Sequence, residues 1–224
     1  MVSAPVLTRV QKGFTLVEMT VVIAIIGTIT IIALSSQSTF NRSLVLTDTA
    51  YSVAFSAREA QSFGSGSQTF NGVSNPGYGI HLDRSQLTKY ILFADVANGG
   101  SPVTGCPLGT TGAPDQKPGD CRYDPANDGT VQTFSFDHGF KMKDFCGVSG
   151  GVRKCSDDAS NQLSTLDITF TRPNTSATMG GKLVDGTSVV YTCADMTLTD
   201  DSGAYTRSIR FSSLGEISVG ESCS

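Results

Sequence analysis

Apolar residues are arranged in two different ways along this chain. Residues 14–34 read FTLVEMTVVIAIIGTITIIAL, and Glu18 is the single charged residue in this run. An α-helix of this length extends about 31 Å, which is enough to cross a lipid bilayer. The pattern therefore predicts one membrane-spanning helix near the N-terminus.

Residues 35–63 continue this helix in an amphipathic form. They contain no Pro or Gly, and the positions that we expect to face the body recur at steps of three and four residues. These positions are Phe40, Leu44, Thr47, Tyr51, Ala54, Phe55 and Arg58. We expect the helix to end near Phe63, because Gly64 and Gly66 suit a helix C-terminus. A single helix over residues 14–63 measures about 75 Å.

Beyond Gly66 the apolar period changes to two residues, which is typical of half-buried strands. The segments with this alternation are YGIHLD, YILFAD, VQTFSF, LDITF, SVVYTC, ADMTLTD, YTRSIRFS and GEISV. Stretches rich in Gly, Pro, Asn and Asp separate them, and no second helix is expected. The predicted fold class is α+β, with one long N-terminal helix packed on a mostly antiparallel β-sheet body.

The charges near the N-terminus predict the orientation of the span. Arg9 and Lys12 precede it and no acidic residue does, so the N-terminus is expected in the cytoplasm and the body outside it. A secretory signal peptide has a shorter apolar stretch, of roughly 7 to 15 residues, and a small-residue cleavage site. The longer run here indicates a retained single-pass anchor.

Glu18 is costly inside such a span unless a cation neutralises it. If the chain is cut after Gly13, the new α-amino group of Phe14 lies about one helical turn from Glu18. The carboxylate of one copy can then pair with the amine of a neighbouring copy.

The stretch KGFTLVE, followed by a long apolar helix, resembles the class III signal of type IV prepilins and type II secretion pseudopilins. The resemblance implies that prepilin peptidase cleaves between Gly13 and Phe14, that the new terminus is methylated, and that Glu18 guides docking into a filament. It divides the chain into a leader (1–13), a transmembrane half-helix (14–34), an extracytoplasmic half-helix (35–63) and a disulfide-bonded globular body (64–224).

The order YGIHLD, ILFAD, LDITFTRPN and YTRSIRFSSLGEISV is similar to the body of minor pseudopilins and minor pilins of the GspH/FimT type. The implied partners are other pilins or pseudopilins, prepilin peptidase and the inner-membrane assembly platform. The implied location is the inner membrane and then the filament of a type IV pilus or type II secretion system. Major pilins often have a Pro near the position of Ser35, so the lack of one here argues against a kink.

Six cysteines follow the predicted span, in a compartment where disulfides persist. Six cysteines allow 15 pairings. Loop closure favours near neighbours, which are Cys106 with Cys121, Cys146 with Cys155, and Cys193 with Cys223. Zinc is not expected, because the cysteines lack CxxC spacing.

The Gly-rich turns of FADVANGG and YDPANDG contain oxygen-bearing side chains, namely Asp95, Asn98, Asp124, Asn127 and Asp128. Such oxygens suit Ca²⁺, although their spacing is not that of an EF-hand. Asn and Asp also stabilise turns through their own side chains. The sequence leaves both interpretations open, and no other cofactor is expected.

The residues that could support catalysis do not form a recognisable site. Gly147, Ser149 and Gly151 satisfy GxSxG, but we expect them in a tight loop between Cys146 and Cys155 rather than in a strand–turn–helix elbow. His81 alternates with apolar neighbours and is expected to face solvent, and His138 is expected in a turn. We therefore do not expect an enzyme.

A second function class is a binding module displayed on a filament, which grips DNA, a surface or a secreted substrate. Lys141, Lys143, Arg153 and Lys154 surround Cys146 and form a small basic cluster. The net charge of −4 and the acidic tail GESCS disfavour phosphate binding. A nucleic-acid partner is thus disfavoured, and the filament subunit is the preferred hypothesis.

Overall fold

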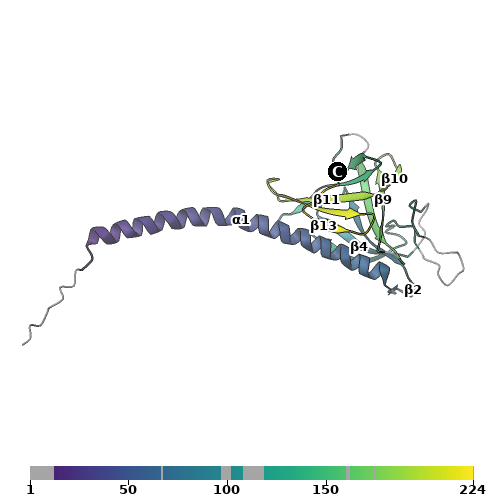
Figure 1. Ribbon diagram of the computed structural model, residues 1–224, viewed down its shortest axis with the longest axis horizontal. Helices are drawn as coiled ribbons and strands as arrows, with labels where there is room; N and C mark the ends of the chain where they lie inside the picture. Colours follow the sequence, from purple (N-terminus) through teal and green to yellow (C-terminus); the bar gives the residue numbers. More distant parts are fainter. Residues whose placement is uncertain are drawn as a thin grey trace, which may run out of the picture. The chain divides into compact units, whose positions relative to one another are not determined.

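The computed structural model describes residues 13–66, 68–96, 102–107, 119–159, 162–173 and 175–223, without the side chains of residues 35–40. The chain divides into two compact units, Met1–Arg42 and Ser43–Ser224. One helix, α1 (Leu16–Ser65), includes residues of both units (Figure 1). The predicted leader falls, except for Gly13, outside the described residues.

The strands form two main antiparallel sheets and one small hairpin. The six-stranded sheet has the order β10-β9-β8-β3-β4-β5, the five-stranded sheet has the order β13-β12-β11-β6-β7, and β1 pairs with β2. The bounds are β1 (Thr69–Phe70), β2 (Val73–Ser74), β3 (Gly77–Asp83), β4 (Lys89–Asp95), β5 (Gly129–Ser135), β6 (Lys141–Ser149), β7 (Val152–Cys155), β8 (Leu163–Phe170), β9 (Ala177–Leu183), β10 (Ser188–Tyr191), β11 (Cys193–Thr199), β12 (Thr206–Ser212) and β13 (Ile217–Val219). The predicted α+β fold, a helix on antiparallel sheets, is confirmed.

Residues of α1 from Leu46 onward pack against both sheets in a single core. The helix contributes mainly small side chains, namely Leu46, Ala50, Val53, Ala54, Ala57 and Ala60. Hydrogen bonds join the helix to each sheet: the Ser56 and Tyr90 hydroxyls lie 2.9 Å apart, and Gln61 Nε2 donates to the carbonyl of Gly215 at 2.9 Å. The helix therefore bridges β4 of one sheet and the β12–β13 turn of the other.

The predicted packing face of α1 is wrong for Leu44, Tyr51 and Phe55, whereas Phe40, another predicted member, lies among the residues whose side chains are not described. Leu44, Tyr51 and Phe55 are 51%, 51% and 65% exposed, whereas the alanines are buried. Small side chains let the helix approach the sheets closely. The same close approach explains Gly64, which lies inside α1 rather than ending it: a Cβ there would be 2.2 Å from the carbonyl oxygen of Phe170.

The six-stranded sheet is covered on its second face as well. Residues 102–107 and 119–128, which we call the cover, lie over this face. The ring of Tyr123 packs at a tilt beside the rings of His81 and Phe93, with centroid distances of 4.8 and 5.2 Å. His81 is therefore buried and not solvent-facing as predicted. Its Nδ1 lies 2.6 Å from Oδ1 of Asp167. Burial lowers the pKa of His81, but the Asp167 carboxylate more than offsets this, so the pKa is raised.

The stretch from Cys146 to Cys155 is a β-hairpin, not the loop that the sequence predicted. Cys146 pairs with Cys155, and Ser149 pairs with Val152, across β6 and β7. Gly150 and Gly151 form the turn between the two strands. Ser149 is thus the last residue of a strand and is followed by a second strand rather than by a helix. This geometry does not form a nucleophile elbow. His138 lies in a turn, as predicted.

Candidate processing and assembly site

The start of α1 is stabilised by a cap that the sequence interpretation missed. Thr15 precedes the helix, and its Oγ1 accepts a hydrogen bond from the Glu18 N–H at 3.3 Å. The Thr15 carbonyl accepts the Met19 N–H at 3.2 Å. Thr15 and Glu18 have the spacing of a capping box, T-x-x-E, in which an acidic residue lies in the first turn. Glu18 thus has a local role, near the positive end of the helix dipole, besides the pairing predicted for it.

The apolar part of α1 is exposed along its whole length. Residues Leu16–Leu34 have a mean hydropathy of 2.4, and none of this window is buried. Within the described residues, this is the one helix that is long and apolar enough to cross a membrane. Phe14, just before it, is 78% exposed. Gly13 and Phe14, the predicted processing residues, thus lie directly before the helix in accessible backbone.

The threonine hydroxyls inside this apolar stretch form hydrogen bonds within the helix. The hydroxyls of Thr20, Thr28 and Thr30 donate to carbonyls one turn earlier, at 2.8, 3.1 and 2.8 Å. Such back-bonding removes the cost of placing a hydroxyl in hydrocarbon. Glu18 is the one side chain of the Leu16–Leu34 stretch whose charge needs a partner from elsewhere.

Three disulfides hold the body of the second unit. They join Cys106 to Cys121, Cys146 to Cys155, and Cys193 to Cys223, with Cα–Cα distances of 5.8, 4.0 and 5.9 Å. These are the near-neighbour pairs that loop closure favours. The Cys106–Cys121 bridge lies in the cover over the six-stranded sheet. The Cys146–Cys155 bridge joins β6 to β7, and the Cys193–Cys223 bridge attaches the C-terminal tail to β11.

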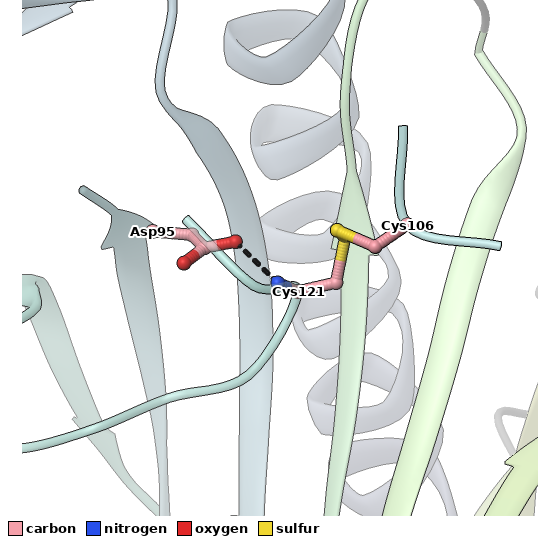
Figure 2. A group of neighbouring side chains, drawn as sticks. All are labelled: Asp95, Cys106 and Cys121. Carbon is pink, nitrogen blue, oxygen red and sulfur yellow. Dashed lines mark hydrogen bonds between the residues drawn. A yellow bond between two sulfur atoms is a disulfide. The ribbon is translucent and has the colours of Figure 1, made fainter. Parts of the chain in front are cut away.

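Asp95 fastens the cover next to the first disulfide (Figure 2). Its two carboxylate oxygens accept the backbone N–H groups of Asp120 and Cys121 at 3.1 and 2.7 Å. Burial, and then the charge of Asp128, raise the pKa of Asp95 to about 8. Gly119 has a φ of +104°, and a Cβ there would lie 2.2 Å from the Asp95 carboxyl carbon. Only glycine therefore fits beside this carboxyl group.

The other acidic residues predicted for calcium stabilise the turn before β5. Asp128 accepts the N–H groups of Val96 and Asp124 at 3.0 and 2.8 Å. Asp124 accepts the Ala126 N–H at 2.9 Å and the Asn127 side-chain amide at 2.6 Å. These bonds match the turn interpretation, and a bound calcium ion stays a prediction. Asn98, the fifth residue of that set, lies outside the described residues.

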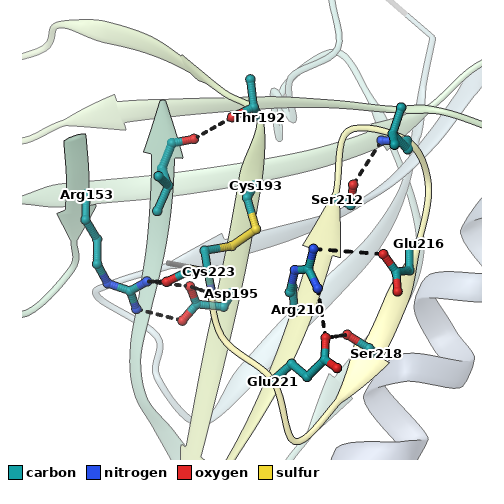
Figure 3. Close-up of a disulfide and its surroundings, with 12 residues drawn as sticks. Arg153, Thr192, Cys193, Asp195, Arg210, Ser212, Glu216, Ser218, Glu221 and Cys223 are labelled. Carbon is teal, nitrogen blue, oxygen red and sulfur yellow. Dashed lines mark hydrogen bonds and ion pairs between the residues drawn. A yellow bond between two sulfur atoms is a disulfide. The ribbon is translucent and has the colours of Figure 1, made fainter. Parts of the chain in front are cut away.

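The C-terminal tail is held by an ion pair as well as a disulfide (Figure 3). The two terminal guanidinium nitrogens of Arg153, Nη1 and Nη2, each donate to one carboxylate oxygen of Asp195 at 2.8 Å, and Asp195 is fully buried. Arg153 also donates to the carbonyl of Cys223 at 2.8 Å, and the Cys223 N–H donates to Asp195 at 3.2 Å. The Asp195 carboxylate raises the pKa of Arg153. Arg153, one of four residues in the predicted basic cluster, is thus committed to the fold and is not available to phosphate.

Comparisons with known proteins give one match, at the N-terminus. Residues 8–34 match the family model described as the prokaryotic N-terminal methylation motif. No curated protein and no solved structure matches the chain. The matched residues contain Gly13, Phe14, Glu18 and the whole exposed apolar stretch of α1. The chain is therefore a prepilin-like protein that carries an N-terminal methylation motif.

Proposed function

We propose that this chain is a minor pilin or pseudopilin, a filament subunit of a type IV pilus or type II secretion system. In this proposal, prepilin peptidase cuts between Gly13 and Phe14, and the mature chain stays in the inner membrane until the assembly platform adds it to a filament. The body, outside the membrane, is then carried along as part of the filament surface.

The observation that carries the proposal is the exposed apolar half of α1 with one carboxylate in its first turn. A helix that is apolar on all sides is stable only when lipid or other helices cover it. Lipid covers the helix in the precursor, and neighbouring helices replace lipid in a filament. The methylation motif over residues 8–34 supports the same assignment.

Glu18 supplies the specific contact in this assembly. Once residues 1–13 are removed, the Phe14 α-amine is a cation at the depth of the first helical turn. A carboxylate from the neighbouring subunit can pair with it, and breaking one side of a buried pair costs about 3–5 kcal/mol. The proposal therefore predicts that the charge of Glu18, and not only its cap, is needed for assembly.

Two substitutions at Glu18 separate these roles. Glu18→Gln keeps the capping-box geometry and removes the charge, whereas Thr15→Ala removes the cap and keeps the charge. We expect both variants to insert and to be cut after Gly13, and only Glu18→Gln to be depleted from sheared filaments. Mass mapping of the new N-terminus and quantitative immunoblots of membrane and filament fractions measure the two steps.

Gly13→Val is the control for processing, since a bulky residue at the cut site should leave the precursor whole. The proposal fails if the mature chain does not start at Phe14 in a host with active prepilin peptidase. The docking role fails if Glu18→Gln protein reaches filaments at the unmutated level.

A further inference from the structure

A groove of about 600 Å³ lies where the rims of the two sheets meet, within the second compact unit. The six-stranded sheet lines it with the β3–β4 turn, which includes Arg84, and with Ser164 of β8. The five-stranded sheet lines it with Lys143 of β6 and with Ser156, the residue after β7. Sites for small ligands measure about 300–1,000 Å³, so the groove has the size of a binding site.

Two β-bulges, one from each sheet, supply lining residues of this groove. The pairing of β6 with β11 skips Lys143, and the pairing of β8 with β9 skips Ser164. Bulges re-aim side chains and are over-represented beside functional sites. Of the three register shifts in the described strand pairings, two therefore fall at the same groove.

Main-chain hydrogen bonds fix the rims of the groove relative to each other. The Met142 N–H donates to the carbonyl of Leu87 at 2.8 Å and so joins β6 to the β3–β4 turn of the other sheet. The Arg84 N–H donates to the carbonyl of Ser164 at 2.9 Å. A groove that is preformed in this way binds a ligand without a large cost in ordering its own residues.

The lining has two cationic side chains, Arg84 and Lys143, and two anionic ones, Asp83 and Asp157. The ion pairs of the described residues include none of these four. One oxygen of Asp83 accepts the Ser85 N–H at 2.7 Å. Two positive and two negative charges cancel, so the groove offers charged donors and charged acceptors with no net charge.

Hydroxyl groups suit such a lining, because each hydroxyl donates one hydrogen bond and also accepts. A sugar hydroxyl can accept from a cationic side chain and donate to a carboxylate, and hydrogen bonds to charged groups are the stronger ones. Ser156 adds a buried donor, since it is 3% exposed. Its Oγ accepts the Phe145 N–H at 3.0 Å, and its hydroxyl proton has no acceptor among the described hydrogen bonds.

Other ligand classes fit the lining less well. A ligand with a net charge meets charges of both signs, so attraction and repulsion offset each other. An extended peptide needs pockets for its apolar side chains, and Leu87 is the single apolar side chain among the lining residues. We propose that the groove binds a neutral, hydroxyl-rich oligosaccharide through charge-assisted hydrogen bonds. This inference goes beyond the filament role and does not depend on it, because all of the lining residues belong to the second compact unit.

An array of immobilised oligosaccharides tests the ligand class. It carries neutral saccharides, uronic-acid saccharides and peptides, and it is incubated with the purified full-length chain in a detergent that has no sugar headgroup. We expect at least one neutral saccharide to bind, and titration with the same saccharide in solution then gives its Kd. The proposal is overturned if no saccharide binds, or if uronic-acid saccharides or peptides are the only ligands.

Substitutions in the groove test the location. Lys143→Met and Arg84→Met should each weaken binding of that saccharide about ten-fold or more, because each removes a charged donor. Lys141→Met is the matched control, since Lys141 is exposed on the same strand and does not line the groove, and it should bind as the unmutated chain does. Circular dichroism establishes that each variant is folded. If folded Lys143→Met and Arg84→Met bind as well as the control, the groove is not the site and the proposal is overturned.

The charge balance has its own test. Asp157→Asn leaves the lining with one more cation than anions, so its preference should move toward uronic-acid saccharides. An unchanged preference would refute the reasoning from cancelled charges. None of these results depends on cleavage after Gly13 or on Glu18, so saccharide binding and the proposed filament role succeed or fail separately.

Discussion

Arg153 and Asp195 provide a direct test of what holds the C-terminal tail onto the five-stranded sheet. We consider Arg153→Met and Asp195→Asn in the fragment 43–224, which corresponds to the second compact unit. Both changes keep most of the side-chain volume and remove one charge. The two residues differ in exposure: the Asp195 side chain is 0% exposed and that of Arg153 is 39% exposed.

This difference in exposure predicts unequal losses of stability. Arg153→Met leaves a buried carboxylate with the Cys223 N–H as its remaining donor among the bonds described above, and breaking a buried pair in this way costs about 3–5 kcal/mol. Asp195→Asn leaves a guanidinium that water can reach, so the loss is that of charge-assisted hydrogen bonds, about 1.5–3 kcal/mol. The more exposed partner should therefore be the more damaging one to remove.

Urea unfolding at pH 7, followed by far-UV circular dichroism, measures both losses. Arg84→Met is the matched control, because Arg84 is exposed and is in none of the ion pairs of the described residues, and a change of at most about 0.5 kcal/mol is expected. The reasoning is refuted if Arg153→Met costs no more than this control, or if Asp195→Asn costs more than Arg153→Met.

Three further predictions concern the same fragment. Replacing Cys193 and Cys223 by Ser should lower the free energy of unfolding by about 3–4 kcal/mol, the chain-entropy value for a loop of this length, and an unchanged urea midpoint would contradict it. The raised pKa of His81 means that its ion pair adds stability below about pH 6.5 and loses it as the pH rises through the folded-state pKa, so His81→Asn should cost more at pH 6 than at pH 8. Equal costs at both pH values would count against the pair. Gly119→Ala should destabilise more than Gly186→Ala, because both sites have positive φ but only at Gly119 does the new Cβ meet a buried carboxyl group; chemical denaturation of the two variants tests the order.

Several features follow from the sequence because their causes are local. The membrane-length helix depends only on an uninterrupted apolar run, and most strands depend on an alternation between neighbouring residues. The near-neighbour disulfides depend on short loops. The methylation motif is a contiguous stretch, so the start of the mature chain could be predicted without a fold.

Other features depended on which surfaces meet in three dimensions. The sequence favoured Tyr51 and Phe55 as packing residues because they recur at three- and four-residue steps, but the sheets lie so close to the helix that alanines occupy the packed face. β9 escaped prediction because Gly180 and Gly181 interrupt its alternation, and a Cβ at Gly180 would lie 2.6 Å from Val103 of the cover.

The burial of His81 also could not be predicted from the pattern of its own strand. His81 alternates with apolar residues, which predicts a solvent-facing side chain when one face of a sheet is open. A segment some forty residues later, held by Asp95 and the Cys106–Cys121 bridge, closes that face and buries the imidazole beside Asp167. Periodicity reports which residues share a face of a strand, whereas burial depends on what the rest of the chain places against that face.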